Sequence, residues 1–283
     1  MFTLSNNALI LSILDPAVDT ARLGSRYCTG GYIWQIEDLN QGPLLTGPQY
    51  PSPAPLPFHG QGAPEAFVAP LGNQDAAVGE AVTVIGVGEV LCTSTIKPFH
   101  VRDNPTVQRF CSWKVEERAG CIRMTTEQSS GSHSLNLMRT VTLDGRTVTS
   151  QTEIVNHSSA DLLLSWFPHP FFPPAPDGRC CRFGFPWSLP DNAGYIRDEQ
   201  GVLCLKREYP WEKGLFQQLG IPSGVELAAE IMHPAVGTVR VATDYPLALL
   251  PVWANSGTFS PEAYLHRVVP AGERTRWKIM YRF

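Results

Sequence analysis

Hydrophobic and polar residues alternate over short segments along most of this chain. The clearest case is residues 276–283, where one face carries Trp277, Ile279, Tyr281 and Phe283 and the other carries Arg276, Lys278 and Arg282. Val239 and Val241 flank Arg240 in the same way. A period of two residues is typical of a β-strand with one buried face.

Turn residues separate these segments at short intervals. Asp144-Gly145-Arg146 lies between two β-rich runs, residues 140–143 and 147–150, and predicts a hairpin. Residues 81–91 are also β-rich, and their glycines at 86 and 88 predict a bulge or bend. The apolar residues 8–14 are expected to form the first strand.

Helical signals are sparse, with short turns expected only over residues 64–69 and 212–219. Two proline-rich segments, residues 42–57 and 172–191, predict long irregular loops, which often line or cover sites. For residues 42–57 the alternative interpretation is a rigid surface loop without a function. Many short strands between turns predict an all-β sandwich or barrel. No linker divides the chain into two parts of different amino-acid composition, so we expect a single domain over residues 1–283.

Composition restricts the class of partner. The hydrophobic fraction of 43% and the charged fraction of 17% are those of an ordinary folded protein. A net charge of −4 provides no basic surface for nucleic acid or an anionic membrane, so a small, neutral ligand is favoured. The apolar residues 8–14 are too short to span a bilayer, and no cation precedes Arg22, so neither a membrane segment nor a signal peptide is expected.

The seven cysteines are odd in number and form no Cys-x-x-Cys motif. Cys180 and Cys181 are adjacent, so on a strand they would point to opposite faces and make a poor metal clip. We therefore expect reduced, buried thiols in a cytoplasmic protein rather than an extracellular disulfide framework.

One short segment contains a candidate catalytic histidine. His169 lies between Pro168 and Pro170, and the surrounding aromatics are Trp166, Phe167, Phe171 and Phe172. Proline disfavours a helical conformation for the residue before it, so Phe167 and His169 should be extended. A histidine held at a strand end by a stiff apolar frame can line a pocket, although a core histidine with a structural hydrogen bond is an equally good interpretation. His133, His157, His233 and His266 are assigned to turn, surface or core positions.

A second phrase offers a carboxylate in a proline turn. Glu262 follows Pro261, and the preceding residues 253–259 are rich in aromatic and turn residues. Most glutamates lie on the surface, so Glu262 alone predicts little.

Taken in order, these phrases resemble the galactose mutarotase (aldose 1-epimerase) superfamily. The segment from Asn156 to the His-Pro-Phe-Phe at His169 resembles the phrase that holds the family's catalytic acid. The late Pro-Glu at Glu262 is similar to the family's base, and Val-Pro-Ala-Gly-Glu at residues 269–273 is similar to its Pro-Gly-Glu ending. The resemblance extends over residues 135–283, and Gly30-Gly31 with Trp34 resembles the family's opening strand.

The resemblance implies a large antiparallel β-sandwich, a galactose mutarotase-like supersandwich, with a sugar pocket on one sheet face. It also implies that the chain interconverts the α and β anomers of a hexose by acid–base ring opening. His169 would be the general acid and Glu262 the general base. If both residues face one cleft with their tips about a sugar ring apart, catalysis is favoured.

Substrate-binding candidates follow from the same resemblance, because family members place a histidine and an arginine upstream. His59 and the pair His100 and Arg102 are both candidates, and Trp253 is a candidate for stacking on a sugar face. Trp166, Trp187 and Trp211 are further aromatic candidates. The family's middle acidic residue could be Asp191, Asp198, Glu208 or Glu212, and nothing in the sequence chooses among them.

Two alternatives remain open. A hexose-6-phosphate 1-epimerase would need a cationic pocket, with Arg102, Lys97 or Arg182 clustered near His169. A carbohydrate-binding domain could keep the fold without the chemistry. Nucleotide-binding, zinc-protease and nucleophile-elbow motifs are absent from the sequence. Ring opening needs no metal, so we expect no metal site and no cofactor, and a sugar as the partner.

Overall fold

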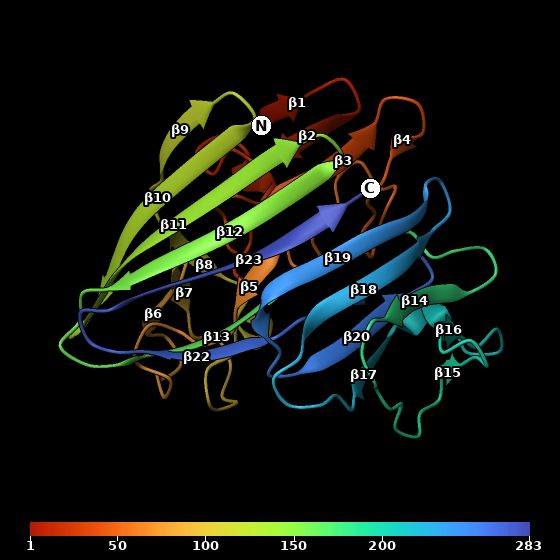
Figure 1. Cartoon of the computed structure of the whole chain (residues 1–283). Coiled ribbons are helices and arrows are strands. Elements are labelled where there is room, and N and C mark those ends of the chain that lie inside the picture. The colour runs from red at the N-terminus through yellow and green to blue at the C-terminus, as the bar shows by residue number, and fades with distance from the viewer.

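The two-residue alternation produces antiparallel strands along the whole chain. The computed structural model describes all residues 1–283, which form β1 to β23 and three single 3₁₀ turns. The strand pairings are antiparallel throughout, including the large sheet that dominates Figure 1. The chain is therefore an all-β protein, as its pattern predicts.

One sheet of ten strands forms the larger layer. Its strands, in spatial order, are β15 (Tyr195–Arg197), β16 (Leu203–Leu205), β14 (Arg179–Phe183), β18 (Glu226–His233), β19 (Gly237–Pro246), β23 (Arg274–Arg282), β12 (Thr147–Asn156), β11 (His133–Asp144), β10 (Cys121–Ser130) and β9 (Lys114–Arg118). The predicted hairpin around Gly145 joins β11 to β12, and both strands extend well beyond the predicted runs.

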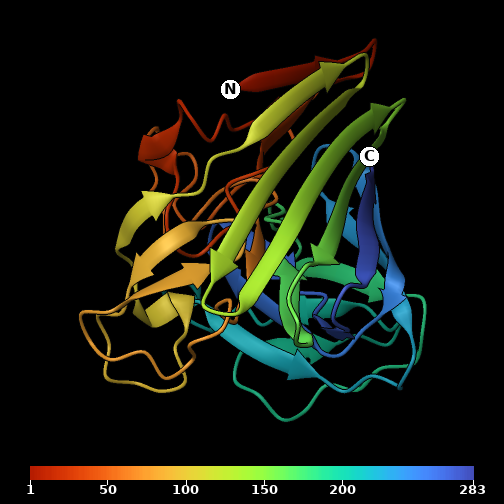
Figure 2. The ribbon, with the colours of Figure 1, turned by 90° about the vertical axis from the view of Figure 1, so that its left-hand side faces the viewer.

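Four smaller sheets make up the rest. The N-terminal sheet comprises β1 (Phe2–Ser5), β2 (Leu9–Ile13), β3 (Ile33–Asp38) and β4 (Gly42–Pro43). The others are β22 (Leu265–Val269), β13 (Leu162–Pro168) and β5 (Glu65–Phe67); β17 (Leu215–Leu219), β20 (Leu250–Asn255) and β21 (Thr258–Pro261); and β6 (Ala81–Val84), β7 (Gly88–Leu91) and β8 (Val107–Phe110). Figure 2 shows the N-terminal strands and β6–β8 to one side of the long strands β10–β12.

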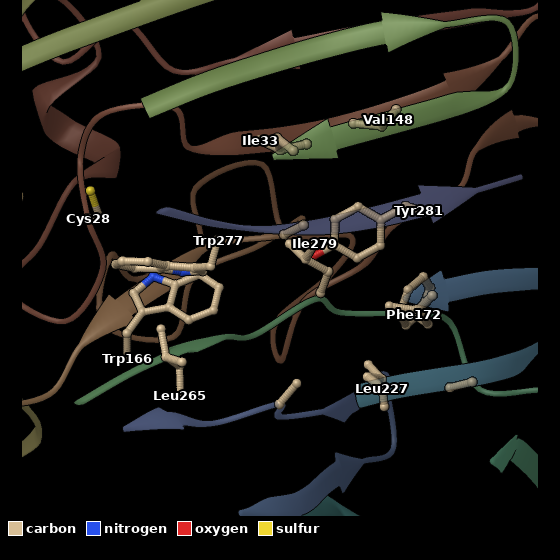
Figure 3. Packing of buried hydrophobic residues seen from close by; sticks show 14 of the residues in the cluster. Cys28, Ile33, Val148, Trp166, Phe172, Leu227, Leu265, Trp277, Ile279 and Tyr281 are labelled. Carbon is tan, nitrogen blue, oxygen red and sulfur yellow. The ribbon is translucent and has the colours of Figure 1, made fainter. Parts of the chain in front are cut away.

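The core lies between the large sheet and these smaller ones. It includes a cluster of 50 buried residues from both the N-terminal and the C-terminal parts of the chain, and β6 and β7 form a smaller cluster of their own. Trp277, Ile279 and Tyr281 of β23 are each at most 1% exposed and lie in this core, as their alternation predicts. In Figure 3, Trp277 packs beside Trp166 of β13, so the large sheet contacts the strand that leads to the site.

Three local predictions were wrong. Residues 64–69 contain β5, and residues 215–219 form β17 after the single 3₁₀ turn η3 (Trp211–Lys213). The proline-rich residues 172–191 contain β14. In these three cases pairing with a neighbouring strand overrides the local propensity. Residues 8–14 form a strand as predicted, but it is the second one, because β1 precedes it.

The remaining expectations concern the hydrophobic segments and the thiols. Gly86 lies in the turn between β6 and β7, so the predicted bend is a complete hairpin. All seven cysteines are free, but only five are buried, while Cys111 and Cys121 are partly exposed. The other 3₁₀ turns are η1 (Thr20–Arg22) and η2 (Val101–Asp103), and no helix has the length and apolar character to traverse a lipid bilayer.

Candidate active site

His169 is fixed where β13 ends. Pro168 pairs with Glu65 of β5, and the backbone N–H of His169 donates to the Pro64 carbonyl at 2.8 Å. Because the flanking prolines keep the backbone extended, the imidazole projects from a rigid strand end.

Backbone hydrogen bonds between distant segments bring Glu262 next to His169. Phe172 and Phe259 exchange backbone N–H···O bonds of 2.9 and 2.8 Å, which align the segment after His169 with β21. The N–H of Glu262 then donates to the Pro251 carbonyl of β20 at 2.8 Å. The result is a distance of 3.4 Å between His169 Nε2 and Glu262 Oε1.

The two side chains are adjacent without a good hydrogen bond between them, since 3.4 Å exceeds the usual N–H···O range. They are closer than the sugar-ring separation expected from the sequence. His169 is 2% exposed and Glu262 is 4% exposed, yet both line one cavity of about 460 Å³. This volume is in the usual range for a small-molecule site.

Aromatic rings enclose the imidazole. The ring centroid of His169 lies 4.4 Å from Phe171, 5.7 Å from Phe167, and 6.1 Å from both Tyr27 and Trp253. The aromatics expected around His169 included Trp166 and Phe172, but those two side chains point into the core. Alternation along the strand explains this difference, because neighbouring residues project to opposite sides.

Burial shifts both titrating groups in the direction that disfavours charge. Burial lowers the pKa of the His169 imidazole well below its usual range, and the nearby Arg26 cation lowers it further. Burial raises the pKa of the Glu262 carboxyl to about 7, although Arg26 opposes that shift. A protonated His169 is therefore a stronger acid, and an ionised Glu262 a stronger base, than either group is in water.

The four substrate-binding candidates, His59, His100, Arg102 and Trp253, all line this cavity. His100 Nδ1 accepts the backbone N–H of Arg102 at 3.0 Å, which orients its ring at the start of η2. The Arg102 side chain is 69% exposed and pairs with Asp103 at 3.7 Å.

Arg26 also lines the cavity, and the sequence provided no motif that singled it out. Its guanidinium carbon lies 5.0 Å from the ring centroid of Tyr27 and 5.2 Å from that of Phe58, and Nη1 donates to the Phe58 carbonyl at 3.4 Å. No carboxylate pairs with it within 4 Å. The cavity therefore contains a half-buried cation without an acidic partner.

Several candidates lie elsewhere. None of the proposed middle acidic residues, Asp191, Asp198, Glu208 and Glu212, lines the cavity, and neither do Trp166, Trp187, Trp211, Lys97 and Arg182. Asp198, for example, accepts backbone N–H groups of its own turn, from Gln200 and Val202. Glu262 is consequently the only carboxylate in the cavity lining.

The fold is shared with known structures, although the sequence matches no protein-family model and no curated protein. A galactose mutarotase-like protein from Lactobacillus casei superposes with a TM-score of 0.62 at 11% identity, over 100% of this chain and 99% of that one. A galactose mutarotase related enzyme from Lactobacillus acidophilus gives 0.58 at 10% identity, over 100% and 97%. An aldose epimerase homologue from C. elegans gives 0.55 at 10% identity, over 99% and 97%. The chain thus has the galactose mutarotase-like fold that its sequence resembles.

Proposed function

We propose that this protein is an aldose 1-epimerase that interconverts the α and β anomers of a hexose. The observation that supports this proposal is the 3.4 Å distance between His169 Nε2 and Glu262 Oε1 at one cavity. In a cyclic sugar the ring oxygen and the anomeric hydroxyl are both bonded to C1. A proton donor and a proton acceptor that lie side by side can therefore each bond one of these two oxygens.

The reaction needs two proton transfers in each direction. His169 gives its Nε2 proton to the ring oxygen while Glu262 takes the proton of the C1 hydroxyl; the C1–O bond of the ring breaks, and C1 becomes an aldehyde. After rotation about the C1–C2 bond, the C5 hydroxyl attacks the other face of the aldehyde. Its proton goes to His169, and Glu262 returns its proton to the aldehyde oxygen, which becomes the new anomeric hydroxyl. Both side chains end as they began.

The surroundings of the pair suit this sequence of steps. The closed ring reacts from the form in which His169 is an imidazolium and Glu262 a carboxylate, and in the open-chain intermediate both groups are neutral. Burial disfavours the charged forms, as the lowered pKa of His169 and the raised pKa of Glu262 indicate. The protein interior therefore favours the proton transfers that open the ring.

The rest of the cavity provides groups that suit a sugar. Trp253 and Phe171 offer aromatic faces on which the C–H bonds of a pyranose can pack, while His59, His100 and Arg102 can bond its hydroxyls. We assign these residues to substrate binding on their position in the lining.

A second candidate function is epimerisation of a hexose 6-phosphate, which the unpaired Arg26 favours. Of the cations that the sequence suggested for this role, Arg102 lines the cavity and Lys97 and Arg182 do not. Arg26 and Arg102 together could hold a phosphate, because a guanidinium forms charge-assisted bonds to phosphate oxygens.

The test is anomer exchange measured by NMR across a panel of aldoses and their 6-phosphates. Faster exchange than the uncatalysed rate with neutral hexoses supports the first candidate, and a preference for the phosphorylated sugars supports the second. Binding of sugars without any exchange would identify a carbohydrate-binding domain and overturn both. The exposed His157→Ala variant is the matched control for His169→Ala, since it removes an imidazole that does not line the cavity.

A further inference from the structure

The segment of Ser260 and Glu262 contacts both ring nitrogens of His169. Ser260 Oγ lies 2.8 Å from His169 Nδ1, and Glu262 Oε1 lies 3.4 Å from Nε2. Ser260 lies in β21 and Glu262 directly follows that strand, so the two side chains, two residues apart, project to the same side. Ser260 is fully buried and does not line the cavity, so it lies behind the imidazole relative to a bound sugar.

Ser260 is the only side chain that hydrogen-bonds the imidazole, since Glu262 lies at 3.4 Å from Nε2 without a good hydrogen bond. The other neighbours of the ring are the aromatics Tyr27, Phe167, Phe171 and Trp253. Aromatic walls can hold the plane of an imidazole, but they distinguish poorly between a ring and the same ring rotated by half a turn about the Cβ–Cγ bond. That rotation would present ring carbon atoms where the reaction needs a nitrogen.

A hydroxyl differs from other partners because it can both donate and accept. It can donate to Nδ1 when that nitrogen carries a lone pair, and it can accept from Nδ1 when that nitrogen carries a proton. His233 provides a contrast within the same chain: its Nε2 lies 2.8 Å from the Leu44 carbonyl oxygen, which can only accept. A carbonyl requires a proton on the nitrogen that it bonds, whereas the Ser260 hydroxyl can bond Nδ1 with or without a proton.

We propose that Ser260 is a positioning residue whose hydroxyl holds His169 with Nε2 directed at the cavity in each protonation state of the ring. This role rests on the proposed function, in which His169 gives and then recovers a proton at Nε2. Ser260 exchanges no proton with the substrate; it bonds Nδ1 throughout and leaves Nε2 free.

The experiment compares Ser260→Ala with Thr258→Val. Thr258 is on the same strand and fully buried, and its hydroxyl donates to the Phe172 carbonyl at 3.1 Å rather than to His169. We expect Ser260→Ala to lower kcat by about 10- to 100-fold and to leave KM nearly unchanged, because a misdirected group slows the reaction without weakening binding. We expect Thr258→Val to lower thermal stability while leaving the pH profile of kcat as in the wild type. Ser260→Thr keeps the hydroxyl and should restore most of the rate.

A second readout needs no activity and so separates this proposal from the proposed function. Long-range ¹H–¹⁵N NMR spectra report which nitrogen of His169 carries the proton, and Ser260→Ala should change that distribution while Thr258→Val should not. If Ser260→Ala fails to fold, Ser260→Cys, which nearly keeps the volume but is a weak donor, is compared in the same two ways. Wild-type kcat together with an unchanged His169 spectrum in the serine variant would overturn the proposal. If the wild-type protein catalyses no anomer exchange while the spectrum still responds, the proposed function fails and the bond from Ser260 to His169 stands.

Discussion

Glu65 and Glu262 are both buried glutamates beside a basic side chain, but their surroundings differ. Glu65 is 3% exposed and forms an ion pair with Arg139 of β11, which is 1% exposed. Further hydrogen bonds surround this pair: Arg139 also donates to Thr152, to Ser150 Oγ at 2.9 Å and to the Gly30 carbonyl at 3.3 Å. Ser150 in turn donates to Glu65 Oε1 at 2.6 Å.

The pair of His169 and Glu262 is equally buried and much less completely bonded. Apart from His169 at 3.4 Å, no side chain bonds the Glu262 carboxylate, and the pair faces a cavity. Under the proposed function, burial alone does not distinguish a structural charge from a catalytic one. What distinguishes them is whether the chain itself supplies the bonding partners, because a buried polar group without partners is costly unless a ligand completes it.

The first test of the comparison removes a charge from the open pair, His169 and Glu262, which faces the cavity. We expect His169→Ala and Glu262→Gln each to lower the rate of anomer exchange by about 10²–10⁴-fold, the usual contribution of a general acid or base. Glu262→Gln should not lower stability, since it removes a poorly bonded buried charge. His169→Ala should lower it, because the variant loses the 2.8 Å bond to Ser260 and leaves a cavity among the aromatic rings. NMR exchange rates and urea titrations measure both properties. A rate within a factor of two of wild type for either variant would show that the open pair is not catalytic.

Breaking the sealed pair, Glu65 and Arg139, should lower stability instead of activity. Arg139→Met or Glu65→Gln should lower the free energy of unfolding by about 3–5 kcal/mol, because one buried charge loses its partner. The surface pair of Arg240 and Glu230, 3.5 Å apart with Arg240 66% exposed, is the matched control. Arg240→Met should change the free energy of unfolding by less than about 1 kcal/mol. Equal losses for the two arginine variants, measured by urea denaturation, would contradict this part of the comparison.

The pH dependence of stability sharpens the difference further. Burial raises the pKa of Glu262 in the folded protein to about 7, from an ordinary value of 4.5. The folded state therefore binds more protons than the unfolded state between these values, so this group's contribution to stability is full at low pH and is lost as the pH rises to about 7.

Glu262→Gln removes this loss of stability with rising pH, because glutamine does not titrate. The free energy of unfolding of this variant relative to wild type should increase by roughly 3 kcal/mol between pH 4.5 and about 7. His169 also titrates beside Glu262, with its pKa lowered by burial, but it is present in both proteins, as are Arg26, Tyr27 and Tyr264. The exposed Glu199→Gln variant should show no such change with pH, and a flat difference for Glu262→Gln would argue against the raised pKa.

The smallest effect concerns the cation beside the open pair. If the substrate is phosphorylated, Arg26→Ala should raise its KM by about tenfold and should raise the KM of the neutral hexose much less. Arg102→Ala should have a smaller effect because its side chain is 69% exposed. Arg118 of β9 is exposed and does not line the cavity, so Arg118→Ala is the control. Equal changes for both sugars in the Arg26 variant would favour the neutral substrate.

Much of the fold could be predicted from local patterns in the sequence. The alternation at Trp277, Ile279 and Tyr281 identified β23, and Gly145 marked the turn between β11 and β12. The strands β5, β14 and β17 were missed because their residues carry weak or contrary local signals, and only pairing with distant neighbours makes them strands.

The candidate site was predictable to a similar extent. His169 and Glu262 could be singled out because prolines and aromatics mark their phrases. Arg26 and Ser260 could not, because each matters only through a contact with a residue far away in the sequence. Ser260, for instance, lies 91 residues from the imidazole it bonds. Such contacts depend on register between strands, as in the bridge between Phe172 and Phe259, which no single segment specifies.

The position of β23 in the large sheet has a consequence for how the protein is made. This strand lies between β12 and β19, and residues 274–282 are synthesised after both of those neighbours. While the ribosome is still translating, β12 and β19 therefore each carry an unpaired edge, and the two halves of the sheet have nothing to join them. A messenger cut short before these codons would yield a chain with two open strand edges, which would be prone to aggregation and to capture by chaperones.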